Sequence, residues 1–221
     1  MQLQKILLVL GAGYSVSACN TNQTLPDSSA PAIHLVRNSR YMGDMTGFSF
    51  ISNPQLSNFT VCHGNTCRYI SKVSLSNDEW RPIKELFDRT ANGPEEEREQ
   101  IGQAIALLET IVGEKTGTSN DKAENMEGFG ENGQMDCVDE STNTSVYLTL
   151  LQNAGLLQWH VVDHRVSRGV LSLKPPHFTA VVREKQNNER YAVDSWFLKN
   201  GESPYIVPLS SWKKGWKPVS K

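Results

Sequence analysis

The residues of this sequence best suited to chemistry are one cysteine, one histidine and one aspartate. Cys137 stands where a helix is predicted to begin, His177 opens a predicted strand, and Asp194 lies in the next predicted strand. A thiol acts as a nucleophile when a base within hydrogen-bond reach takes its proton, and that base needs a partner that orients it. The three residue types therefore indicate a Cys-His-Asp arrangement, provided that the fold brings them together.

The stretch 134–155 predicts an amphipathic helix that carries Cys137 at its start. Asp136 is a typical N-cap, and Asp139 follows at the third helical position, where its carboxylate reaches back to free backbone N–H groups. Apolar residues then recur every three to four positions, and Gly155 supplies a C′ stop. The positive end of the helix dipole favours the thiolate form of a cysteine at this position. The alternative is that Cys137 is a small buried apolar residue.

The other two residues are expected in a hairpin that follows this helix. Strands are predicted over His177–Arg183 and Arg190–Phe197, with a turn at 186–188. Because side chains alternate along a strand, the odd separation of His177 and Asp194 keeps both on one face when the loop has an even length. Asp194 then fixes the tautomer of the imidazole. The alternatives are a packing role for the histidine, and for the aspartate an ion pair with an arginine of its own hairpin.

The N-terminal residues predict export. Residues 1–18 contain a positive residue, a short apolar run and small residues before a cysteine, as a signal peptide does. The run Val16–Cys19 resembles the lipobox of bacterial lipoproteins, which implies cleavage before Cys19 and attachment of lipid to that residue. With Asn20 in the next position, the resemblance implies the periplasmic face of the outer membrane. The alternative is plain cleavage near Ala18.

The predicted export bears on which cysteines can form a disulfide. With Cys19 lipidated, three cysteines remain in an oxidising compartment. Cys62 and Cys67 flank four residues typical of a tight hairpin turn, so a disulfide between them is expected. The alternatives are a metal site that also uses His63, and a redox pair, although the four-residue spacer differs from the usual two. Cys137 is then the leftover thiol.

Composition and charge narrow the classes of partner. The chain has 221 residues and a formal net charge of -2. It shows no basic patch with interleaved aromatic residues, so we expect no nucleic-acid partner. No apolar run is long enough to span a bilayer as a helix of the mature protein.

The predicted elements divide the chain into three parts: the signal 1–18, a polar tether 19–32 and one α+β domain 33–221. The domain begins with strands and two helices in 33–133 and ends with the cysteine helix and an antiparallel sheet in 134–221. The first helix starts at a capping box, is interrupted near Pro82 and ends at Asn92-Gly93, and Pro94 opens the second. In the tail 198–221, Ile206 and Val207 predict a last strand. Three tryptophans are expected to close the core, with a substrate-lining role as the alternative for the first: Trp196, Trp212 and Trp216.

The order of cysteine at a helix start, histidine on a strand and aspartate on the next strand resembles the transglutaminase-like branch of the papain-like thiol enzymes. The local sequence is similar to the bacterial transglutaminase-like cysteine proteinases, whose motif is Asp-Cys-acid-Asp followed by a helix. The chain matches this motif at Asp136, Cys137 and Asp139 and departs from it at Val138. The resemblance covers 134–197, about three tenths of the chain.

The resemblance implies a transglutaminase-like, papain-like α+β fold and acyl transfer through a thioester. Cys137 would be the nucleophile, His177 the general base and then acid, and Asp194 the orienting residue. The backbone N–H of Cys137 is an oxyanion donor, and the side chain of Gln134 is a second candidate. Water as acceptor gives a protease or amidase, and an amine gives a transglutaminase. The substrate would be a peptide or protein in the cell envelope, and the rival hypothesis is a non-catalytic lipoprotein that binds an envelope partner.

The family also raises the question of calcium, because some members bind it through acids around the cysteine. Asp136, Asp139 and Glu140 are possible oxygen ligands, although Val138 stands where the family has an acid. Carboxylates close to a thiol raise its pKa. A positive charge near Cys137, from calcium or from a protonated His177, would have to offset them.

Overall fold

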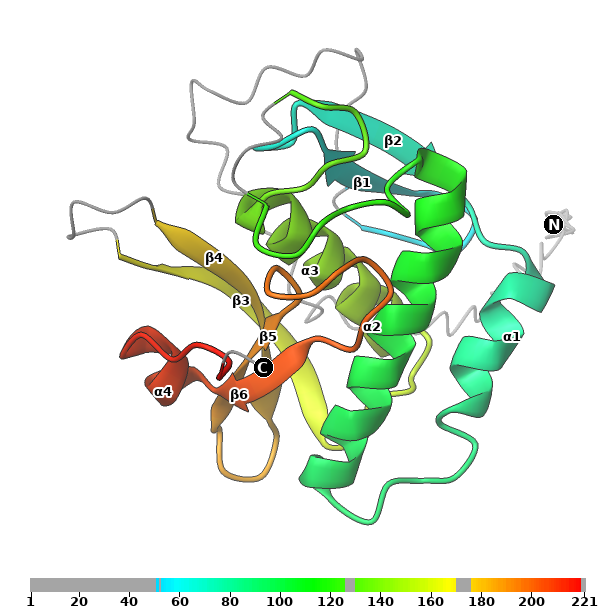
Figure 1. Ribbon diagram of the computed structural model, residues 1–221. Helices are drawn as coiled ribbons and strands as arrows, with labels where there is room; N and C mark the ends of the chain where they lie inside the picture. The colour runs from blue at the N-terminus through cyan, green and yellow to red at the C-terminus, as the bar shows by residue number, and fades with distance from the viewer. Residues whose placement is uncertain (1–50, 52, 126–129, 170–175, 220–221) are drawn as a thin grey trace, which may run out of the picture. The chain divides into compact units, whose positions relative to one another are not determined.

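The computed structural model describes residues 51, 53–125, 130–169 and 176–219. All of them fall within the unit that spans 31–221. The structure is mixed α and β, and both of its sheets are antiparallel (Figure 1). The expected signal peptide, Cys19 and the expected tether lie outside the described residues. Within the part of the chain that is described, no helix is both long enough and apolar enough to cross a membrane.

Four strands form the larger sheet, in the order β3-β4-β5-β6. Their bounds are β3 His160–Arg168, β4 His177–Glu184, β5 Arg190–Asp194 and β6 Tyr205–Pro208. Strand β3 begins at His160 and includes neither Gln158 nor Trp159. The reason is that the backbone N–H groups of Gln158 and Trp159 bind the carboxylate of Glu97, which removes them from strand pairing. Strand β5 also ends before the expected Phe197.

Helix α3, Cys137–Asn153, contacts the larger sheet through β4 and the smaller sheet through β1 (Figure 1). The expected start and stop are both present, since Asp136 is the N-cap and Gly155 has a φ of 70°. The prediction of an amphipathic helix is wrong, because every residue from Asp139 to Leu151 is buried. A helix covered on both sides has no solvent face. Its polar residues bond neighbouring backbone and side chains instead, as Asn143 does with both backbone groups of Cys62.

The N-terminal part supplies the smaller sheet and two helices. Strands β1, Phe59–His63, and β2, Tyr69–Val73, form an antiparallel hairpin. Helix α1, Asn77–Glu85, starts at the predicted capping box with Pro82 inside it, and it ends well before the expected stop at Asn92-Gly93. Helix α2, Pro94–Thr116, begins at the predicted proline and packs on α3.

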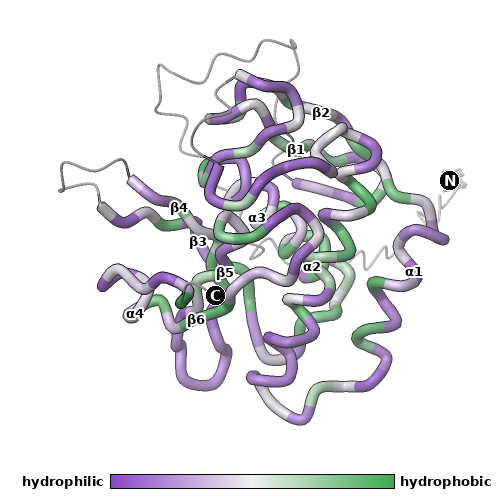
Figure 2. The backbone as a smooth tube through the Cα atoms, viewed as in Figure 1, coloured by the Kyte–Doolittle hydropathy of each residue, from purple (hydrophilic) through white to green (hydrophobic). Residues whose placement is uncertain are grey.

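The C-terminal tail contains an element that the sequence did not predict. After β6, which covers the expected Ile206 and Val207, residues Leu209–Lys213 form the short helix α4. Its Trp212 is fully buried and belongs to a small second core with Val181, Ala192 and Leu209. Hydrophobic residues mark β5, whereas hydrophilic residues mark the turn between β4 and β5 (Figure 2).

Candidate active site

The sulfur of Cys137 lies against the backbone at the start of β4. Its Sγ is 3.8 Å from the carbonyl oxygen of Pro176, to which the thiol donates, and it accepts from the backbone N–H of Phe178. These two residues flank His177 on either side. The N-terminus of α3 therefore meets the strand at the position of the predicted base.

His177 and Asp194 form the pair that the sequence predicts. Ala180 pairs with Val193 between β4 and β5, so His177 and Asp194 are diagonal neighbours on the same face. The imidazole Nε2 lies 2.7 Å from Asp194 Oδ2, and the aspartate side chain is 1% exposed. The carboxylate is an acceptor only, so Nε2 carries the proton and Nδ1 remains to accept one.

Three aromatic rings surround the imidazole. The ring centroids of Trp196, Phe197 and Trp212 lie 4.8, 5.4 and 5.5 Å from that of His177. Trp196 was expected either in the core or along a substrate path, and its ring packs directly on the histidine. The aromatic walls restrict rotation of the imidazole and limit the access of water to its bond with Asp194.

The thiol form of Cys137 is favoured in the resting protein. Burial raises its pKa to about 12, and the charges of Asp136 and Asp194 act in the same direction, against the N–H of Phe178 and the charge of Arg165. The expectation that the helix dipole favours thiolate is therefore not met, because burial and two carboxylates outweigh the dipole. Nucleophilic attack by this sulfur requires a base that takes its proton.

Arg165 supplies the positive charge that the acids near Cys137 require, and nothing in the sequence singled it out. It lies in β3 where the register with β4 shifts, between Asp163 and Val166. Its Nη1 donates to the carbonyl oxygen of Val138 at 3.0 Å and also to the hydroxyl of Thr142. The guanidinium is thus fixed under the first turn of α3, where its charge offsets those of the carboxylates.

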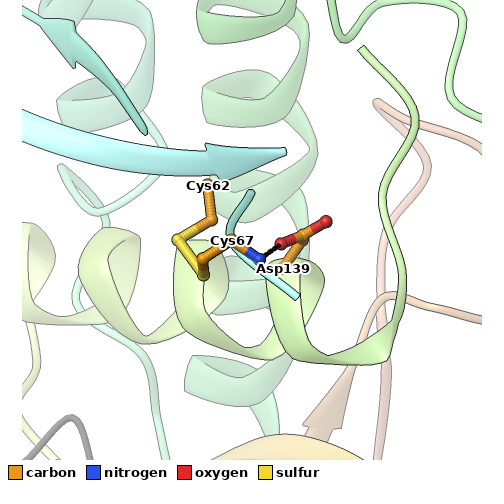
Figure 3. A group of neighbouring side chains, drawn as sticks. All are labelled: Cys62, Cys67 and Asp139. Atoms are coloured by element: carbon orange, nitrogen blue, oxygen red, sulfur yellow. Dashed lines mark hydrogen bonds between the residues drawn. A yellow bond between two sulfur atoms is a disulfide. The ribbon is translucent and has the colours of Figure 1, made fainter. Parts of the chain in front are cut away.

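The turn of the β1–β2 hairpin binds the two aspartates on either side of Cys137. Asn65 donates its backbone N–H to one oxygen of Asp139 at 2.8 Å. Cys67 donates its backbone N–H to the other oxygen at 2.5 Å (Figure 3). Thr66 donates its N–H to Asp136 Oδ2 at 3.0 Å. We call residues 64–67 the hairpin clasp, because the amides of 65–67 bind the start of α3 and the amide of Gly64 binds Gln134 just before it.

The hairpin clasp has an unusual backbone. All four residues have a positive φ, between 54° and 81°, and only the first of them is a glycine. This left-handed conformation costs roughly 1–2 kcal/mol for each residue with a side chain. It aims successive N–H groups at one side, which is how a backbone binds anionic oxygens. A disulfide between Cys62 and Cys67, the pairing expected from the sequence, closes the turn (Figure 3).

Removal of this disulfide is expected to destabilise the fold. The bond closes a loop with a sequence separation of 5, and a loop of this size contributes about 2 kcal/mol. We expect the double variant Cys62→Ala, Cys67→Ala to lose about that much free energy of unfolding in urea. Reductant should lower the stability of the wild type to the level of the variant and leave the variant unchanged. Equal stability of the two proteins under oxidising conditions would contradict this role.

The three acids proposed for calcium do not share one site. Asp136 and Asp139 each accept backbone N–H groups at both carboxylate oxygens. Glu140 interacts most strongly with Glu109 and Asp121, and its side chain is hydrogen-bonded to Asp121. Within the described residues, the one group of three ligand atoms within 4.8 Å of one another is Cys62, Cys67 and Asp139. The two sulfurs of this group form the disulfide and are not thiolates, so the group does not fit a metal ion.

Gln134 binds the loop that leads to Cys137. Its side-chain amide group donates to the backbone carbonyl oxygen of Asn120 at 3.1 Å and accepts from the side chain of Asn125 at 2.6 Å. The backbone carbonyl oxygen of Gln134 accepts from the N–H of Gly64. The backbone N–H of Cys137, in the first turn of α3, belongs to the groups that have no acceptor within the helix. That N–H is the better placed of the two predicted oxyanion donors.

A buried carboxyl cluster lies behind the site and was also missed. The cluster consists of three acids, each at most 4% exposed: Glu109 of α2, Asp121 between the helices, and Glu140 of α3. Burial raises the pKa of Glu109 to about 7 and that of Asp121 to about 6, and burial together with the other two acids raises the pKa of Glu140 well above its usual range. Their spacing along the chain gives no sign of this cluster, because it forms only when α2 packs on α3.

Cys137 at the start of α3 thus contacts the backbone on either side of His177, whose imidazole is bound to Asp194, and Arg165 and the hairpin clasp lie at the start of α3. The sequence named Cys137, His177 and Asp194 as candidates, but it did not point to Arg165 or to the clasp. Comparison with family models, with curated proteins and with solved structures finds no match for the chain.

Proposed function

We propose that this protein is a thiol hydrolase or acyltransferase with a transglutaminase-like fold, anchored in the cell envelope and acting on amide bonds of peptides or proteins. The observation that carries the proposal is the sulfur of Cys137 against both backbone neighbours of His177, whose imidazole is bound to buried Asp194. In this order the imidazole can take the thiol proton while the carboxylate orients the imidazole and stabilises its charged form. The signal peptide and the lipidation of Cys19 that the sequence predicts support the location.

The proposed reaction has two stages. His177 Nδ1 accepts the thiol proton while the sulfur of Cys137 attacks the amide carbonyl, and the N–H of Cys137 binds the resulting oxyanion. The imidazolium then gives its proton to the leaving amine, the C–N bond breaks and a thioester remains. In the second stage water, or another amine, attacks the thioester and loses a proton to His177. The sulfur then leaves as thiolate and recovers its proton from the imidazolium.

One observation favours a second candidate function. Burial raises the pKa of the Cys137 thiol to about 12, as in a structural cysteine. A non-catalytic lipoprotein that uses the same fold to bind an envelope partner would retain this arrangement without reacting.

The reactivity of the thiol separates the two functions. If His177 takes the proton, Cys137 of the intact protein alkylates with iodoacetamide at pH 7 at least about tenfold faster than in His177→Ala. The matched control is His164→Ala, on the exposed side of β3, which should alkylate like the wild type. The rate is measured by mass spectrometry of the peptide that contains Cys137. Equal slow rates in the wild type and in His177→Ala would favour the binding protein.

A further inference from the structure

We infer that Trp212 of α4 is a positioning residue for the proton relay, an inference that rests on the proposed function. Its indole Nε1 donates to Asp194 Oδ2 at 2.7 Å. This is the same oxygen that accepts from His177 Nε2, also at 2.7 Å. A single carboxylate oxygen therefore accepts hydrogen bonds from both the imidazole and the indole.

The chemistry of the indole suits this task. A buried carboxylate is costly unless donors satisfy it, and Asp194 is almost fully buried. Two donors that converge on one oxygen fix the rotation of the carboxyl group about its Cβ–Cγ bond. Indole N–H is a donor only and does not exchange roles, so it holds the orienting group in its acceptor state throughout the cycle. The imidazole then keeps one tautomer, with Nδ1 free to receive the thiol proton.

The fold fixes Trp212 through a cation. Arg168, the last residue of β3, donates from Nη1 to the carbonyl oxygens of Trp212 and Trp216, at 2.6 and 2.8 Å. Its guanidinium carbon lies 4.4 Å from the centroid of the Trp212 ring. A five-residue helix is not stable by itself, and no side chain caps the N-terminus of α4. These contacts therefore determine where the helix lies, and they give the C-terminal tail a part in the site.

The inference is tested with Trp212→Phe, which keeps an aromatic ring and removes the N–H donor. In the full chain, alkylation of Cys137 at pH 7 should slow by about fivefold to tenfold relative to the wild type, because the relay loses its fixed carboxylate. The matched control is Trp216→Phe in the same tail. Among the described residues the side chain of Trp216 makes no hydrogen bond to Asp194, so this variant should alkylate at the wild-type rate.

A double-mutant cycle separates positioning from packing. In an Asp194→Ala background the indole has no carboxylate to hold, so Trp212→Phe should cause no further slowing of alkylation. A packing role would slow the reaction by the same factor in both backgrounds and would overturn the inference. If Trp212→Phe does not fold, 3-benzothienylalanine at position 212 keeps the shape of the indole without its N–H. It should then reproduce the slowing, and a wild-type rate with this residue would overturn the inference.

The two proposals fail in different ways. If the wild type and His177→Ala alkylate equally slowly, the proposed function falls. If these two differ as expected but Trp212→Phe reacts at the rate of Trp216→Phe, only the role of Trp212 falls.

Discussion

Replacement of Arg165 by methionine is expected to lower the free energy of unfolding by about 3 kcal/mol. The guanidinium donates to Val138, Ser141 and Thr142 in the first turns of α3, and its charge interacts with those of Asp136 and Asp139. Methionine keeps the length and apolar volume of the side chain but leaves these acceptors and carboxylates without their cation. Urea unfolding followed by circular dichroism measures the loss.

The same variant should also react more slowly. The charge of Arg165 acts to lower the pKa of the Cys137 thiol, so its removal raises that pKa further. We expect alkylation at pH 7 to slow by at least about tenfold. Arg165→Lys is the matched control, because it keeps the charge but not the planar fork, and it should recover reactivity more than stability. A methionine variant as stable and as reactive as the wild type would show that the acids require no cation.

The protein is expected to become more stable as the pH falls from 8 to 5. Burial raises the folded-state pKa of Glu109 to about 7 and that of Asp121 to about 6, so between these values and the usual range of free carboxyl groups the folded state binds more protons than the unfolded state. Stability from such groups is fully present below the unfolded pKa and is lost as the pH rises through the folded pKa. A shift of this size corresponds to about 3 kcal/mol for each of the two groups.

Glu140→Gln isolates this contribution from other titrating groups. His63, whose pKa burial lowers, acts in the opposite sense below pH 6.5 and is common to every variant. The glutamine removes one ionisable carboxyl group from the cluster without changing its shape, so it should raise stability at pH 8 by about 2 kcal/mol and flatten the dependence on pH. Glu114→Gln, at an exposed position of α2, should do neither. A Glu140→Gln protein that is less stable than the wild type at pH 8 would show that the ionised cluster is satisfied.

The parts of the site that the sequence revealed depend on local rules. The N-cap Asp136 and the stop at Gly155 are decided within a turn of the helix they bound, and the diagonal pairing of His177 with Asp194 follows from alternation along one hairpin. The tight turn expected between Cys62 and Cys67 pointed to the bond between them, which the structure contains.

The parts that the sequence did not reveal depend on packing between distant segments. Arg165 reaches Cys137 because β3 changes register, and no residue pattern marks that shift. Trp212 had the expected burial, but its hydrogen bond to Asp194 requires a short helix whose position the side chain of Arg168 determines. Helix α3 is likewise buried because both sheets cover it. Its apolar stripe predicted a solvent-exposed polar face, which the helix does not have between Asp139 and Leu151.

The hairpin clasp has a consequence for how this chain is divided. A boundary at residue 133 would give a C-terminal fragment that contains Cys137, His177 and Asp194. In that fragment Asp136 and Asp139 would lose the hydrogen bonds that the amides of 65–67 donate to them. Asn143 would also lose its strand-like pairing with Cys62. The surroundings of Cys137 at the start of α3 are therefore complete only when the hairpin of residues 59–73 is part of the same folded chain.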